Sequence, residues 1–168
     1  MDLINLPMIW AVLLVVAVFM YILLDGFDLG VGILFPFAEH DLDRDMMMNS
    51  VAPFWDGNET WLVLGGGGLF AAFPMAYAAL MPAIYMPIGF MLIALIFRGV
   101  AFEFRFKAQG TGRRIWDQAF HWGSVVATFS QGLILGTLVQ GLNKSEQKAL
   151  TTAVDQLSRL VDGPAQAG

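Results

Sequence analysis

Residues 6–24 read LPMIWAVLLVVAVFMYILL, an unbroken run of 19 residues without a charged side chain. A helix needs about 20 mainly apolar residues to cross a bilayer, so this run predicts a membrane-spanning helix. Asp25 and Asp28 come next, yet the sequence stays apolar and rich in glycine as far as Ala38. We therefore expect the first span to cover about residues 6–37, with two carboxylates within it.

Further apolar blocks follow the first, at about residues 54–73, 77–98 and 116–142. The chain as a whole is 57% hydrophobic and 14% charged, whereas about a quarter of the residues of a soluble domain are charged. Composition and block length thus predict an all-α integral membrane protein, with a bundle of four transmembrane helices over residues 1–142. Pro82 and Pro87 are expected to kink the third span.

A polar tail follows the four blocks, at residues 143–168. Its apolar side chains recur at the spacing of one helix face, and they are Leu150, Val154, Leu157 and Val161. The tail is therefore predicted to form a short amphipathic helix that ends at Gly163 and Pro164.

Basic residues are concentrated in one of the polar connections. Residues 98–115 hold five of the nine lysines and arginines, and cytoplasmic loops carry an excess of these residues. This connection should therefore be cytoplasmic. Counting spans backward places the other connection, residues 39–52, on the same side, with the N-terminus and the tail outside.

Composition also argues against several classes of site. The formal net charge of -5 argues against a nucleic-acid partner, because binding to a phosphate backbone needs basic clusters. The chain has no cysteine, which excludes disulfides, thiolate metal sites, iron–sulfur clusters and cysteine nucleophiles. We expect neither a metal site nor a cofactor-binding site in this chain.

Asp25 and Asp28 form the first group of residues that carries chemistry. They are three residues apart, so on a helix they share a face. A carboxylate in the hydrocarbon region costs a few kcal/mol or more, and such residues usually face the bundle interior or a water-filled cavity. A buried or water-lined role is therefore favoured. The alternative is that the span ends near Leu24 and that both acids form a solvated cap.

The second group is WDGNETW, residues 55–61, at the start of the second span. Asp56 and Glu59 share a helix face. In one interpretation they are ordinary first-turn acids beside interfacial tryptophans. The other interpretation rests on topology. The first span ends and the second begins at the same membrane face, so four carboxylates gather there and can relay protons.

Arg98 lies at the cytoplasmic end of the third span, level with those carboxylates. It can pair with one of them and hold it ionised, or it can snorkel to the interface. The fourth span carries a polar stripe on one face, formed by Asp117, His121, Ser124, Thr128 and Gln131. We interpret His121 as a hydrogen-bonded packing residue rather than a haem ligand, because no second axial ligand is evident.

The segments together resemble subunit II of the cytochrome bd-type quinol oxidases, including the cyanide-insensitive branch. The matching text is YILLDGFDLGVGILFPF, then APFWDGNETWLVLGGGGLFAAFPMAYA, then ALIFRGVAFEFR, and the likeness runs from about residue 5 to residue 141. The resemblance implies a multi-pass protein of the bacterial cytoplasmic membrane, in contact with lipids and quinone. The resemblance also implies that the chain is one subunit of an oxidase that oxidises quinol and reduces dioxygen to water.

The resemblance also implies how the work is divided between subunits. In that family haem b and haem d belong to subunit I. We therefore expect a haem-bearing partner, and we expect no haem to be bound by this chain. Subunit II supports assembly, and its acidic residues are implicated in proton supply from the cytoplasm. Carried over by motif, the proton-path candidates are Asp25 and Asp56. Supporting roles are expected for Asp28, Trp55, Asn58, Glu59 and Arg98.

The C-terminal part departs from the family pattern. Family members are much longer, and the tail from Lys144 onward does not resemble their continuation. The chain is therefore expected to be a fragment, a frameshifted product or one half of a split subunit, and not to be catalytic by itself. An alternative function is a small oligomeric membrane transporter or proton channel, because intramembrane acids and a kinked span would serve it as well.

Overall fold

The computed structural model describes residues 6–141, 148 and 151–152. Every element over residues 6–140 is helical, as predicted for an all-α protein. In chain order the elements are α1 (Leu6–Leu34), the short 3₁₀ helix η1 (Phe35–Phe37), α2 (Asp41–Val51), α3 (Trp55–Ala72), α4 (Pro74–Lys107) and α5 (Thr111–Gln140).

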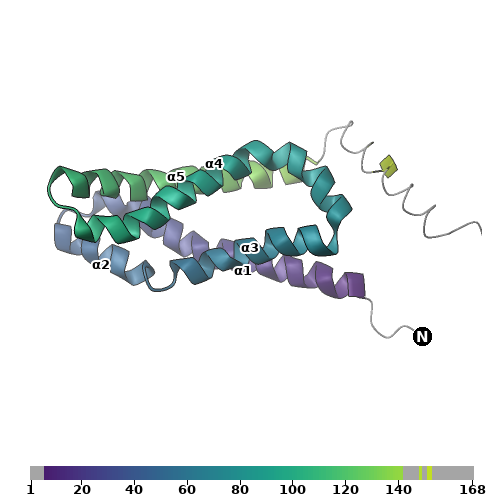
Figure 1. The fold of residues 1–168 in the computed structure, drawn as a ribbon, viewed down its shortest axis with the longest axis horizontal. Coiled ribbons are helices and arrows are strands. Elements are labelled where there is room, and N and C mark those ends of the chain that lie inside the picture. Colours follow the sequence, from purple (N-terminus) through teal and green to yellow (C-terminus); the bar gives the residue numbers. More distant parts are fainter. Residues whose placement is uncertain (1–5, 142–147, 149–150, 153–168) are drawn as a thin grey trace, which may run out of the picture.

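The long helices run side by side in one elongated bundle (Figure 1). α4 packs most extensively against α5, and α1 packs against both α3 and α5. The short helix α2 and the turn between α4 and α5 lie at the same end of the bundle (Figure 1). Residues near the end of α1, the start of α3 and the second half of α4 are thereby brought to one level.

Three helical segments are long and apolar enough to span a membrane, among the residues described: Leu6–Phe37, Pro74–Lys107 and Thr111–Gln140. The prediction of four transmembrane helices is therefore not confirmed. The second predicted span corresponds to α3, which has only 18 residues. Its first turns carry Asp56, Asn58 and Glu59, and the glycine run 65–68 adds little hydrophobicity.

The predicted polar connections are shorter or more ordered than expected. α4 continues to Lys107 and α5 begins at Thr111, so most of the predicted loop 98–115 is helix. The physical reason is burial, because Arg98, Ala101, Phe102 and Arg105 line the inner face of α4 over its last turns. Likewise, most of the connection 39–52 forms helix α2.

Helix α4 also contains both predicted kink residues. Pro82 and Pro87 lie inside it, and neither proline can donate the backbone hydrogen bond of a regular helix. Figure 1 shows that α4 bends near its first turns and then runs straight along α5.

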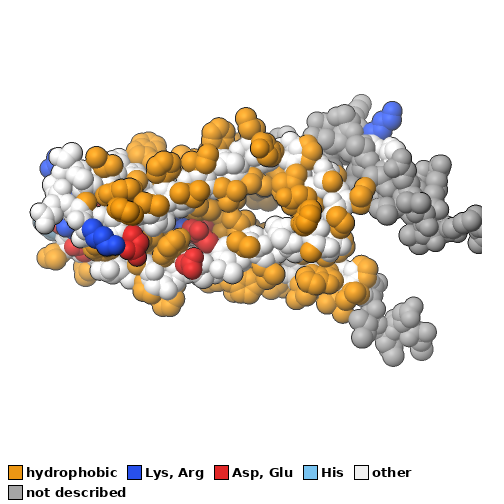
Figure 2. Space-filling view, in the orientation of Figure 1, with side chains coloured by type: hydrophobic (Ala, Val, Ile, Leu, Met, Phe, Trp, Pro, Cys, Tyr) orange, Lys and Arg blue, Asp and Glu red, His pale blue; other side chains and the backbone are white. Residues whose placement is uncertain are grey.

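Two apolar clusters form the interior of the bundle. One contains Phe35, Met48, Val51, Ala101, Phe102 and Phe120. The other contains Leu29, Met91, Ala94, Leu95 and Ala127. The outer surface is also rich in apolar side chains, and Figure 2 shows them over most of the visible face of the bundle, with the charged side chains toward the end that holds α2. Such a surface suits a protein whose solvent is lipid.

The predicted amphipathic helix, residues 143–162 of the polar tail, lies almost wholly outside the described residues, which there include only 148 and 151–152.

Candidate functional site

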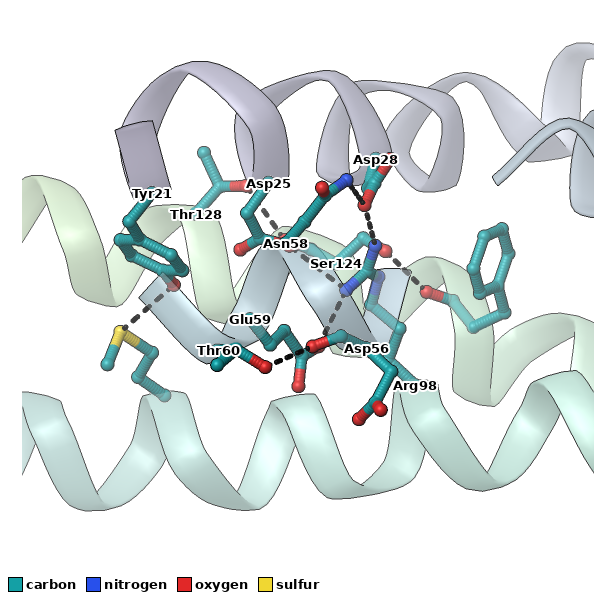
Figure 3. Close-up of polar contacts among 12 residues, drawn as sticks. Tyr21, Asp25, Asp28, Asp56, Asn58, Glu59, Thr60, Arg98, Ser124 and Thr128 are labelled. Atoms are coloured by element: carbon teal, nitrogen blue, oxygen red, sulfur yellow. Dashed lines mark hydrogen bonds and ion pairs between the residues drawn. The ribbon is translucent and has the colours of Figure 1, made fainter. Parts of the chain in front are cut away.

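Arg98 is the centre of a buried ionic cluster, and its side chain is fully buried. Its Nη1 atom lies 3.2 Å from Oδ1 of Asp25 and 2.9 Å from Oε1 of Glu59. Its Nη2 atom lies 3.8 Å from Oδ2 of Asp28. One guanidinium group on α4 therefore faces carboxylates from both α1 and α3 (Figure 3).

The two acids of α1 are interior residues, with Asp25 0% and Asp28 1% exposed. Their spacing of three residues puts both on the face of α1 that looks into the bundle. Asn58 donates a hydrogen bond from Nδ2 to Oδ2 of Asp28 over 2.8 Å. The structure thus agrees with the buried interpretation of these acids and not with a solvated cap at the end of the first span.

The charges in this cluster are not balanced within the chain. The three carboxylates and one guanidinium carry a net charge of −2 if all of them are ionised. Oδ2 of Asp25 and Nε of Arg98 are buried and have no hydrogen-bond partner among the described residues. Burying unbalanced charge is costly, so this arrangement is chemically suited to taking up and releasing protons.

Asp56 lies apart from this cluster. Its side chain is exposed, and its carboxylate makes no hydrogen bond or ion pair with any residue that the structure describes. Asp56 and Glu59 both line a groove of about 550 Å³ between α3 and α4, together with Thr60 and Glu103. Glu59 therefore belongs both to the groove and to the buried cluster, where its side chain faces Arg98 (Figure 3).

Trp55 has a packing role. Its ring stacks on Phe102, with centroids 5.2 Å apart. It also lies against Gly99, where a Cβ atom would come within 3.0 Å of the indole ring. The glycine thus allows α3 to approach α4 at the level of the buried cluster.

On the other side of Asp25, polar contacts continue along α1 and α5. Tyr21 lies one helical turn before Asp25, and its hydroxyl accepts a hydrogen bond from Nε2 of Gln131 over 2.6 Å. The hydroxyls of Ser124 and Thr128 instead donate to backbone oxygens of their own helix, α5. Of the predicted polar stripe, Gln131 therefore joins the surroundings of the buried cluster most directly.

His121 bonds to the backbone of α1. Its Nδ1 atom lies 3.1 Å from the carbonyl oxygen of Gly32, and since a carbonyl can only accept, Nδ1 carries the proton. Its role as a hydrogen-bonded packing residue agrees with the sequence interpretation. In the described part of the chain, no group of three or more His, Cys, Asp or Glu side chains is arranged to hold a metal ion.

A second ionic network was not predicted from the sequence. Arg105, which is fully buried, bonds to Asp117 through Nε and to Asp45 through Nη1. Asp45 also accepts from Arg113, and Arg44 lies 3.5 Å from the second oxygen of Asp117. The network ties α2 to α4 and α5.

Asp45 stays charged in this network. Partial burial opposes its ionised form, but hydrogen bonds from Arg105 and Arg113 outweigh that effect and hold the pKa of Asp45 below its ordinary value. A sequence signal for this network did exist. Arg98 and Arg105 are seven residues apart, two helical turns, so a continuous helix places both arginines on one buried face.

The fold and the buried cluster define a multi-pass, all-helical membrane protein with an interior carboxylate–arginine site. The chain belongs to the cytochrome bd terminal oxidase subunit II family, whose sequence model matches residues 6–162. The predicted end of the resemblance near residue 141 is therefore wrong, because the family match continues into the tail.

Curated relatives agree with the family assignment. The chain is 40% identical over 136 residues to cytochrome bd ubiquinol oxidase subunit 2 of Bacillus subtilis, covering 80% of this chain and 40% of the relative. It is 42% identical over 139 residues to cytochrome bd-I ubiquinol oxidase subunit 2 of Escherichia coli K12, covering 82% and 37%. A probable cytochrome oxidase subunit 2 of Haemophilus influenzae is 38% identical over 139 residues, covering 82% of this chain and 37% of that relative. The chain thus spans about two fifths of the length of these relatives.

Proposed function

We propose that this chain is the non-haem subunit of a respiratory terminal oxidase that oxidises quinol and reduces dioxygen to water. The family match and the names of the relatives support this assignment. Haem b and haem d then belong to a partner, subunit I, and this chain by itself is not catalytic. Its place is the bacterial cytoplasmic membrane, in contact with lipids and quinone.

The contribution of this chain to the reaction is proton supply. Reducing dioxygen to water consumes protons, and apolar protein conducts protons only along titratable groups and water. One observation carries the proposal: Nη1 of Arg98 lies within 3.2 Å of Asp25 and 2.9 Å of Glu59. A buried carboxylate is thereby linked to one that lines an open groove.

The geometry suggests an order for the proton path. Asp56 and Glu59 line the groove between α3 and α4, so they would receive protons first. Asp25 would receive them next, because it shares the Arg98 guanidinium with Glu59. Arg98 holds the carboxylates together, and Asn58 fixes Asp28 beside them.

The orientation in the membrane follows from charge. The turn between α4 and α5 and the helix α2 lie at the same end of the bundle (Figure 1), where the arginine-rich network also lies. We place this end in the cytoplasm by the positive-inside rule, which puts the N-terminus outside. The acidic cluster then takes its protons from the cytoplasm.

The test is oxygen consumption by the complete oxidase, normalised to haem d and measured across pH. Asparagine keeps the size and hydrogen bonding of aspartate but cannot titrate. Asp25→Asn and Asp56→Asn should each lower turnover per haem several-fold, with the larger loss at the buried Asp25. Asp41→Asn, an exposed acid on α2, is the matched control and should behave as wild type.

Two outcomes would count against the proposal. Wild-type turnover per haem in both variants, with or without poor assembly, would leave these aspartates as packing or capping residues. A chain that purifies colourless from its own host, without a haem-bearing partner, would favour a small transporter or proton channel.

A further inference from the structure

Another cavity lies where η1, α2 and α5 meet, and it shares no lining residue with the acidic groove. Its volume is about 280 Å³, and it is lined by Phe35, Pro36, Arg44, Arg114, Asp117 and Gln118. Two guanidinium groups and one carboxylate therefore face the same space, beside a side-chain amide that can donate hydrogen bonds.

The carboxylate in this cavity is already neutralised by the protein. Oδ1 of Asp117 accepts from Nε of Arg105, and Oδ2 lies 3.5 Å from Nη1 of Arg44. The Asp117 side chain is only 9% exposed. The Arg114 side chain, in contrast, is exposed and makes no hydrogen bond or ion pair with any described residue. The cavity therefore has an excess of positive charge.

The surrounding arginines also keep unused hydrogen-bond donors. Nε of Arg44, Nη2 of Arg105 and Nε of Arg113 are buried and have no hydrogen-bond partner among the described residues. A buried donor without a partner costs about 1–3 kcal/mol, and more when the group is charged. All three atoms are shielded from solvent, so an acceptor bound in the cavity would meet the exposed part of Arg44, whose side chain is 27% exposed, and not its Nε.

The Arg44 side chain is also held in place for binding. Its guanidinium carbon lies 5.9 Å from the centre of the Phe35 ring, an arrangement that favours a cation over an aromatic face. Phe35 itself is 1% exposed and packs edge-on against Phe120. A planar guanidinium fixed in this way presents several N–H groups to one anion, and phosphate matches that geometry.

We propose that this cavity binds a phosphate group, with Arg44 and Arg114 as its charge partners and Gln118 as a further donor. The cavity lies where the spanning helices α1 and α5 reach the end of the bundle that carries basic residues. Basic pockets between transmembrane helices at the cytoplasmic side hold anionic lipid headgroups. A phospholipid such as phosphatidylglycerol is therefore the favoured source, and inorganic phosphate is the other.

The experiment uses the complete complex that contains this chain, purified in detergent and analysed by native mass spectrometry. Retention of phosphatidylglycerol is compared with that of phosphatidylethanolamine, which has the same phosphate but no net charge. Arg114→Gln and Arg44→Gln should each lower phosphatidylglycerol retention about fivefold, the size expected for one basic side chain beside an anionic lipid. Lys107→Gln is the control, since Lys107 is exposed at the same bundle end and pairs with Glu103 outside the cavity.

A second arm separates the two sources of phosphate. Delipidated complex is titrated with inorganic phosphate, and its thermal unfolding temperature is measured. A rise in the wild type that Arg114→Gln abolishes, without a preference for phosphatidylglycerol, would assign the cavity to the free ion. Equal phosphatidylglycerol retention in wild type and Arg114→Gln, with no phosphate effect on unfolding, would overturn the proposal. The Arg114 side chain is exposed and unpaired within the described residues, so this comparison holds even if Arg44→Gln does not fold.

Discussion

The Nδ1 atom of His121 on α5 lies 3.1 Å from the backbone oxygen of Gly32 on α1. In a regular α-helix that oxygen would accept from the N–H four residues later, but residue 36 is a proline and has none. His121 therefore donates the hydrogen bond that Pro36, which lacks an N–H group, cannot donate to Gly32. This explains why a polar ring is placed between two apolar helices at the point where α1 ends.

Replacing His121 with alanine should destabilise the chain without affecting haem. The loss of one buried hydrogen bond to a backbone carbonyl is expected to lower the free energy of unfolding by about 1 kcal/mol. The haem absorption bands of the assembled oxidase should stay unchanged. Thermal unfolding and the visible spectrum measure the two effects, and His40→Ala, at an exposed residue, is the control. Loss of a haem band with both subunits assembled would show that His121 is a ligand after all.

Gly32 also sets the distance between α1 and α5. A Cβ atom at this position would lie 1.9 Å from Oγ and 2.5 Å from Cβ of Ser124, closer than atoms can approach. Gly32→Ala should therefore force the helices apart and destabilise the chain by about 1–3 kcal/mol.

Gly30 gives a matched control on the same helix. A Cβ atom there would meet nothing within 4 Å, and alanine is the better helix former by about 1 kcal/mol. Gly30→Ala should be neutral or stabilising in thermal unfolding. Ser124→Gly should relieve part of the Gly32→Ala effect, and a double variant no more stable than Gly32→Ala alone would contradict the steric account.

The buried cluster could be largely predicted from the sequence, because its position depends on residue spacing and on the order of the helices rather than on side-chain packing. Asp25 and Asp28 share a face by spacing, and the end of one helix and the start of the next lie at the same membrane face. Arg98 was expected at that level, and it does contact both acids. Asp56 was grouped with the cluster on the same grounds, but its side chain is exposed.

The rest could not be predicted because it depends on packing between elements far apart in the sequence. Asp45 meets Arg105 only because α2 folds back against α4, and no periodicity in residues 39–52 indicates that. α3 was predicted to be a span because its second half is a block of apolar residues. The helix has only 18 residues, and its polar first turns leave too short an apolar stretch for a span.

Arg98 should be indispensable for stability. Its removal leaves three carboxylates near one another, with Asp25 and Asp28 fully buried, and breaking such a buried pair from one side costs about 3–5 kcal/mol. Arg98→Gln is therefore expected to lower the thermal unfolding temperature and the yield of assembled complex strongly. Lys107→Gln removes an exposed cation of the same helix and should change stability by less than about 1 kcal/mol. Similar unfolding temperatures for the two variants would show that the cluster does not depend on its arginine.

The proposed topology can be tested by labelling, since the chain has no native cysteine. Asp41→Cys on α2 and Gln109→Cys in the turn between α4 and α5 introduce thiols at exposed positions. Both should react with a membrane-impermeant maleimide only after the cytoplasmic side is opened. Reaction of both in intact cells would reverse the orientation, and reaction of one alone would show that the two segments lie on opposite sides.

The pH dependence of stability provides a test of the second network. The pKa of Asp45 is held below its ordinary value in the folded chain, so the unfolded chain binds a proton at a higher pH than the folded chain does. The stability that Asp45 contributes is therefore fully present above about pH 5. It is lost as the pH falls below about 4, the ordinary pKa of an aspartate.

Asp45→Asn should consequently unfold at a lower temperature than wild type at pH 7. A loss of about 1–3 kcal/mol is expected, the size of a hydrogen bond to a charged group at a partly buried site. The gap between the two proteins should narrow as the pH is lowered through 4. Wild type and Asp45→Asn share every other titratable group, so the change in the gap between them reports on the Asp45 carboxylate. Glu39→Gln, at an exposed acid just before α2, should show no such narrowing. A gap between Asp45→Asn and wild type that is constant from pH 7 to pH 3 would mean that Asp45 acts through packing and not through its charge.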